Sequence, residues 1–202
     1  MDRPMTALPT QDRQAPSHEG RFAYYLRRAL RDRKAVWQAL NARRRLHGAA
    51  RLPLTVRVIG RVCATGRRRM TFGEHVLIVG TIVPVELHAG EEGRISIGDG
   101  CFINYGTSIA ALDHVSIGSG CQIGQYTIIN DNDFHCVEDK QRLPPSRPVV
   151  LEDRVWLGAR VIVRRGVRIG HDAVIGAGSV VTRDIPPRSV AVGVPARVIR
   201  SF

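Results

Sequence analysis

The sequence lacks most of the features that reveal a protein's class at first sight. Aromatic residues make up 5% of its 202 residues, and no run of about 18 apolar residues occurs, so we expect no membrane-spanning helix. The N-terminus carries no apolar segment of the secretory type, which predicts a cytoplasmic protein. The four cysteines have neither disulfide-framework nor zinc-type spacing, so no metal site is expected. With 44% hydrophobic residues, the chain is long enough for a sizeable core.

Acidic residues are scarce in the N-terminal third. Residues 1–74 contain 17 Lys and Arg against 5 Asp and Glu, a difference of 12 that equals the net charge of the whole chain. Residues 1–20 are polar and without periodicity, which predicts a disordered tail. Residues 21–50 are predicted to form a basic amphipathic helical segment, because apolar residues recur at helical spacing between arginines: Phe22, Leu26, Ala29, Leu30, Val36, Trp37 and Leu40.

Two interpretations of this basic segment stay open. Its arginines can form a solvated face on a helix that packs against the domain, or they can attach the protein to an anionic membrane surface. A nucleic-acid partner is not expected, because neither aromatic interleaving nor a known nucleic-acid-binding module is present.

The most regular feature is a branched apolar residue at every sixth position between residues 151 and 181: Leu151, Leu157, Val163, Ile169, Ile175 and Val181. A period of six fits neither a helix nor a simple alternating strand. It fits short parallel strands separated by corners, in which three hexapeptides close one triangular coil and successive coils stack at about 4.8 Å. The period-six residue and the small or β-branched residue two places earlier then both point inward.

The same phase extends backwards along the chain, through Ile97, Ile103, Ile109, Ile117, Ile123 and Ile129. Cys101 and Cys121 occupy the inward positions two places earlier in the repeat, which predicts that they stack as small core residues. The phase is broken by two extra residues before Ile117 and by a long insert at residues 131–148, and such inserts often carry function. Weaker repeats precede this region, and residues 86–94 are predicted to leave the coil as a corner excursion.

Residues 51–202 resemble the hexapeptide-repeat acyltransferases, in particular galactoside and maltose O-acetyltransferases and their polysaccharide-modifying relatives. The closing runs IGAGSVVTRDIPP and AVGVPARVIR carry the resemblance most specifically. It implies an all-β fold, a left-handed parallel β-helix, here with an N-terminal basic helical extension. It also implies a homotrimer that uses acetyl-CoA as acyl donor and transfers the acetyl group to a sugar hydroxyl of a glycan or glycan precursor.

Transfer of an acyl group to a hydroxyl requires a base, and a histidine that titrates near neutrality suits this role. The resemblance places the base at His135, although the family's usual His-Pro pair is replaced here by the sequence DNDFH. Asp131 or Asp133 is expected to orient the imidazole, or to be a solvated loop residue. His114, in the two-residue insertion, is the second candidate for the base.

Asn104 lies at the spacing of the family's active-site asparagine. It is expected to stabilise an oxyanion or hold the acceptor sugar, or else to belong to an asparagine ladder at a coil corner. Cys136 is a conceivable thiol nucleophile beside His135, but neighbouring side chains diverge in extended backbone.

The resemblance also predicts the residues that bind the donor. Trp156, Ala159, Ala177, Thr182 and Arg183 are expected to line the pantetheine arm. Arg197 and Arg200 are expected to face the nucleotide phosphates, where guanidinium groups pair well with phosphate oxygens.

Other functions remain as alternatives. An N-acyltransferase acting on an amino sugar or small amine needs the same base. A non-catalytic β-helix scaffold would not need the arginines and the histidine-bearing insert together. A zinc enzyme of the γ-carbonic-anhydrase type needs three converging histidines, and no such spacing is present.

Overall fold

A computed structural model describes residues 33–136, 139, 141 and 143–202. Contacts divide the chain between Val36 and Trp37, and residues 37–202 form one compact unit. The predicted disordered tail and residues 21–32 of the predicted helical segment lie outside the described residues. Helix α2 spans Arg33–Arg45 within that predicted segment, and among the described residues no helix is long and apolar enough to cross a membrane.

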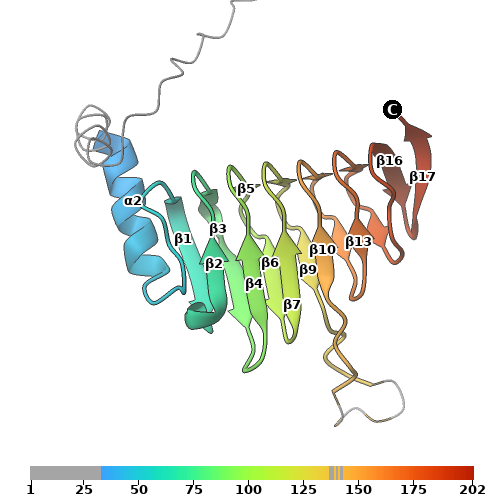
Figure 1. The fold of residues 1–202 in the computed structure, drawn as a ribbon, viewed down its shortest axis with the longest axis horizontal. Coiled ribbons are helices and arrows are strands. Elements are labelled where there is room, and N and C mark those ends of the chain that lie inside the picture. Colours follow the sequence, from blue (N-terminus) through green and yellow to red (C-terminus); the bar gives the residue numbers. More distant parts are fainter. Residues whose placement is uncertain (1–32, 137–138, 140, 142) are drawn as a thin grey trace, which may run out of the picture. The chain divides into compact units, whose positions relative to one another are not determined.

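Within this unit, residues 57–193 form the predicted left-handed parallel β-helix, in which successive coils stack along one axis (Figure 1). The short strands lie on three faces. The first face contains β5 (Phe102–Ile103), β8 (Gln122–Ile123), β11 (Trp156–Leu157), β14 (Val174–Ile175) and β16 (Ser189–Gly193). The second face contains β6 (Ser108–Ala111), β9 (Ile128–Asn130), β12 (Ile162–Val163) and β15 (Val180–Val181). The third face contains β2 (Met70–Phe72), β4 (Arg94–Ile97), β7 (His114–Ile117), β10 (Val149–Leu151) and β13 (Arg168–Ile169).

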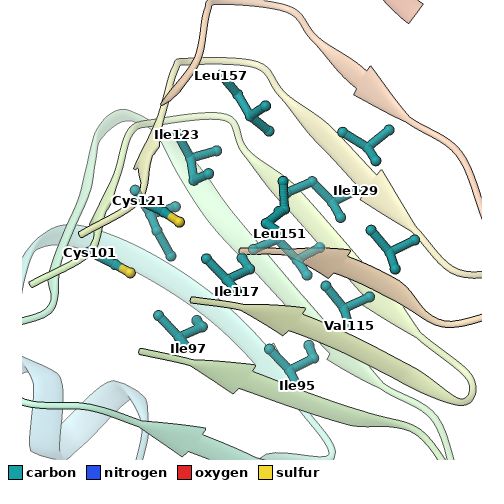
Figure 2. Packing of buried hydrophobic residues seen from close by; sticks show 14 of the residues in the cluster. Ile95, Ile97, Cys101, Val115, Ile117, Cys121, Ile123, Ile129, Leu151 and Leu157 are labelled. Atoms are coloured by element: carbon teal, nitrogen blue, oxygen red, sulfur yellow. The ribbon is translucent and has the colours of Figure 1, made fainter. Parts of the chain in front are cut away.

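The predicted ladder of branched residues is the core. Every period-six residue from Ile97 to Val181 is buried, and the strand register stacks them coil on coil: Ile103 pairs with Ile123, and Ile123 with Leu157. Cys101 and Cys121 lie in the same core as predicted (Figure 2). A solenoid of this kind therefore buries a continuous apolar column even though each strand is only two to four residues long over most of its length.

The first coils are built from longer strands than the later ones, and the strand register shifts between Gly60 and Val62. β1 (Arg57–Thr65) and β3 (Leu77–Ala89) are long parallel strands that run along the first face and then the second, and the short 3₁₀ helix η1 (Arg67–Arg69) follows β1. The predicted excursion at residues 86–94 is wrong for its first half, because Leu87 and Ala89 are buried in β3 while Glu86 and His88 are exposed.

The C-terminus departs from the solenoid. β17 (Ala196–Ser201) turns back and pairs antiparallel with β16. The hexapeptide pattern did not predict this hairpin, which covers the last coil of the first face.

Candidate active site

A groove of about 460 Å³ lies on the first face, along β5, β8, β11 and β14 and the corner that follows them. Its wall is formed by side chains that alternate with the buried ladder and therefore point outward. Trp156 is the largest of these, with 54% of its surface exposed although its neighbour Leu157 is buried. The lining includes Phe102, Asn104, Gln122, Gln125, Trp156, Val174, Ala159 and Ala177.

The corner beside the groove is built from small residues because successive coils approach closely there. A Cβ atom on Gly124 would lie 2.5 Å from the carbonyl carbon of Gly158, and one on Gly158 would lie 2.7 Å from the backbone nitrogen of Ala177. No side chain fits in that space, so these glycines are required by packing rather than by backbone dihedral angles. The result is a smooth channel bordered by Trp156.

Asn104 stands at the start of this corner. Its Oδ1 accepts a 2.9 Å hydrogen bond from the backbone N–H of Tyr105, which fixes the orientation of the side-chain amide. The equivalent positions in the next coils are Gly124 and Gly158, as the pairing of the preceding strands shows. The alternative of an asparagine ladder therefore does not hold for this corner.

Two tyrosines and an arginine lie in the turns that form this same corner in three successive coils. Tyr105 and Tyr126 pack edge to face with ring centroids 5.4 Å apart, and the guanidinium carbon of Arg160 lies 5.8 Å from the Tyr126 ring centroid. These contacts join three successive coils at the corner that adjoins the groove.

The insert at residues 131–148 leaves a different corner, between the second and third faces, and its described residues extend away from the stacked coils (Figure 1). Both carboxylate oxygens of the buried Asp131 accept backbone hydrogen bonds, at 2.9 Å from Leu112 and 2.7 Å from Asp113. The side-chain amide of Asn132 donates to the Pro144 carbonyl at 2.7 Å. Asp131 thus anchors the insert to the preceding coil, and Asn132 joins its two limbs.

Asp133 lies on the outgoing limb and is held by two arginines of the next coil. Arg164 donates to its Oδ1 at 2.6 Å, and Arg165 donates to its Oδ2 at 2.7 Å. His135 follows two residues later with an exposed side chain. The role of Asp133 in orienting His135 stays a prediction, and the carboxylate has partners that the sequence did not suggest.

The predicted site residues fall into two groups within one chain. One group borders the groove of the first face and consists of Asn104, Trp156, Ala159 and Ala177. The other lies at the corner after the second face and consists of Asp133, His135, Thr182 and Arg183. Arg197 and Arg200 lie on β17, where they pair in register with Val192 and Val190 of β16.

Comparison with known proteins identifies the repeat. Residues 148–183 match the family model described as the hexapeptide repeat of succinyl-transferase. The chain is 34% identical over 131 residues to the putative lipopolysaccharide biosynthesis O-acetyl transferase WbbJ of Escherichia coli K12, which covers 59% of this chain and 67% of that protein. The chain belongs to the hexapeptide-repeat acyltransferase family.

Other members resemble parts of the chain. Galactoside O-acetyltransferase of Escherichia coli K12 is 39% identical over 111 residues, which cover 54% of this chain and 55% of that protein, so the match spans about half the length of that relative. The crystal structure of the hexapeptide-repeat acetyltransferase VCA0836 of Vibrio cholerae, complexed with acetyl coenzyme A, superimposes with a TM-score of 0.53 at 25% identity, and covers 83% of this chain and 86% of that one.

His114 and three of the cysteines were the other candidates for chemistry in this hexapeptide-repeat protein. His114 begins strand β7, rather than lying in an insertion, and its Nε2 is 3.1 Å from Ser96 Oγ on the neighbouring coil. The Cys121 thiol lies against Cys101, and this contact together with burial raises its pKa. Cys136 is half-buried in the insert. Among the residues that the structure describes, no cluster of potential metal ligands is found.

Several residues of this family member's site were not predicted. Gln122 and Gln125 line the groove, and the outward position of Gln122 beside buried Ile123 could have been predicted from the hexapeptide phase. The ion pairs of Arg164 and Arg165 with Asp133 could not be predicted from the sequence. They join residues 31 and 32 positions apart, across an insert whose path the repeat pattern does not determine.

Proposed function

We propose that the protein is an acetyl-CoA-dependent O-acetyltransferase that acts on a sugar hydroxyl of a glycan or glycan precursor. The observation that carries the proposal is the groove along the first face, with its glycine and alanine floor, its exposed Trp156 and the oriented amide of Asn104. A narrow apolar channel suits a pantetheine arm, and a relative of the chain is named as a galactoside O-acetyltransferase.

Acetyl-CoA would supply a thioester, whose carbonyl carbon is attacked by the acceptor hydroxyl. In this mechanism His135 accepts the hydroxyl proton as the new C–O bond forms, and it returns the proton to the departing sulfur as the C–S bond breaks. The side-chain amide of Asn104 donates a hydrogen bond to the carbonyl oxygen while negative charge develops there. The proton balance needs no covalent enzyme intermediate.

The separation of the two groups of residues supports a homotrimer. Asn104 and Trp156 border one corner of the coil, while His135 and Arg183 follow another. A second copy of the chain can bring its insert to the groove of the first, and threefold rotation closes such a contact on itself. We therefore propose that each active site combines the groove of one subunit with the insert of its neighbour.

The test is release of free thiol from acetyl-CoA in the presence of sugars and amino sugars. We expect a sugar-dependent rate that falls by about a hundredfold or more in His135→Ala, while binding of coenzyme A, measured by calorimetry, is retained. His114→Ala is the matched control and should keep its rate. A wild-type rate in His135→Ala would refute the base assignment, and transfer to amino sugars alone would favour the N-acyltransferase alternative.

A further inference from the structure

The N-terminal layer of the β-helix, which we define as residues 37–73, carries charge of one sign. It contains nine arginines and neither aspartate nor glutamate. Six of these arginines are exposed: Arg43, Arg44, Arg51, Arg61, Arg67 and Arg68. Because no carboxylate of the layer itself neutralises them, the surface is a strong anion-binding field.

The part of α2 in this layer is fixed in rotation about its axis. The side-chain amide of Asn41 donates to the backbone carbonyls of Val58 at 3.1 Å and Gly60 at 2.8 Å, both in β1. Ala42 and Leu46 are buried beneath the helix. These contacts use the inner side of the helix, so its other residues cannot turn inward without breaking them.

The residues on the outer side of α2 are unusual for a surface exposed to solvent. Trp37 is 72% exposed and Leu40 is 53% exposed, and both border a groove of about 400 Å³ together with Arg44 and residues 58–60. Trp37, Leu40 and Arg44 follow one another at helical spacing, so they share one stripe of the helix. Exposed tryptophan and leucine beside arginine is the composition of a helix that lies at a membrane interface.

We propose that the N-terminal layer binds an anionic lipid surface, with Trp37 and Leu40 entering the headgroup region and the arginines contacting lipid phosphates and carboxylates. Charge complementarity selects this partner. A second copy docked through the same face would bring six exposed arginines against six, which is repulsive. Binding of single-stranded nucleic acid is less well supported, because it uses successive aromatic platforms and Trp37 is the one tryptophan of this layer.

Tryptophan fluorescence gives a direct test, because the chain has two tryptophans. In the full-length Trp156→Phe variant, Trp37 is the sole tryptophan. We expect vesicles of phosphatidylcholine with about 30% phosphatidylserine to shift its emission to shorter wavelength, and brominated lipids to quench it. Vesicles of phosphatidylcholine alone should have little effect, and raising the salt from about 50 mM to about 500 mM should reverse the shift.

Two variants separate the apolar and charged contributions. Trp37→Ala with Leu40→Ala, and Arg43→Gln with Arg44→Gln, should each weaken co-sedimentation with anionic vesicles by about tenfold or more. Val198→Ala with Ile199→Ala is the matched control, because it removes exposed apolar side chains from β17. Vesicle binding without a change in Trp37 emission would overturn the proposal, as would equal binding to neutral vesicles or binding to oligonucleotides alone. The proposal does not depend on the acyltransferase activity, so none of these outcomes requires turnover.

Discussion

Arg165 joins the two limbs of the insert at residues 131–148. Its Nε donates a 2.7 Å hydrogen bond to Oδ2 of Asp133, and its Nη1 donates a 2.8 Å hydrogen bond to the carbonyl oxygen of Pro145. A planar guanidinium can hold two acceptors at once in this way, whereas an ammonium group is a single point charge. The limb that carries His135 is therefore fastened to the solenoid by an arginine that the hexapeptide pattern places at an ordinary corner.

Replacing Arg165 should impair the reaction without affecting the donor groove. We expect Arg165→Ala to lower kcat by about tenfold or more, because a misplaced base loses its alignment, and to leave the affinity for coenzyme A unchanged. Arg165→Lys should recover only part of the rate. Arg154→Ala removes a more exposed ion pair, outside the insert, and should have no effect on kcat. A loss of coenzyme A affinity in Arg165→Ala would contradict the positioning role.

Mixing two inactive variants tests the proposed trimer. If Asn104 and His135 act together from different subunits, His135→Ala and Asn104→Ala should complement each other after the chains are unfolded together and refolded. In an equal random mixture, about a quarter of the sites would combine an intact groove with an intact insert. The measurement is the thiol-release rate relative to wild type. An inactive mixture whose trimers are shown to be mixed would mean that both residues act from one chain.

Trp156 should report occupation of the groove. It is exposed and lies on the wall of the first face, so a bound pantetheine arm would change its surroundings. In Trp37→Phe we expect coenzyme A to change the remaining emission in a saturable manner. Ala177→Phe, which fills the groove floor without adding a tryptophan, should weaken this titration by at least about tenfold. A titration that leaves Trp156 emission unchanged would place the donor elsewhere.

The ion pair between Asp172 and Arg154 predicts a pH dependence of stability. Hydrogen bonds from Arg154 and then from His171 hold the pKa of Asp172 well below its ordinary value of 3.8. A carboxyl group with a lowered pKa in the folded state stabilises the protein above its ordinary pKa, and this contribution is lost as the pH falls toward the folded-state pKa. Asp172→Asn should therefore lower Tm near pH 7, and the difference from wild type should shrink below about pH 4. Glu92→Gln, at an exposed corner, should show no such pattern.

The repeat could be predicted because it is local. Each hexapeptide contains its own inward residue, so the positions of Ile103, Ile123 and Leu157 in one stack followed from counting. The same counting placed Trp156 on the outer surface and Asn104 at a corner. The residues that meet in the groove are thus separated in sequence but related by the period.

Features that interrupt the period could not be predicted in the same way. The hairpin of β17 on β16 reverses the chain, and nothing in a pattern of parallel coils indicates a reversal. The insert contacts Arg164 and Arg165 through a path that the sequence does not constrain. The polar residues Glu86 and His88 hide the alternation at residues 86–89, so the sequence favours an excursion there, although Leu87 and Ala89 continue the core.

The core ladder makes a quantitative prediction about stability. Ile123 is fully buried and pairs in register with Ile103 on one side and Leu157 on the other. Ile123→Ala would leave a cavity in the middle of the column, and short strands cannot collapse to fill it without breaking register, so we expect a loss of about 2–5 kcal/mol in the free energy of unfolding. Ile199→Ala is the matched control on exposed β17 and should change stability by no more than about 0.5 kcal/mol. Denaturant titration at one fixed protein concentration measures both. Equal losses in the two variants would mean that the column of branched residues is not what holds the coils together, because burial is the property that distinguishes the two isoleucines.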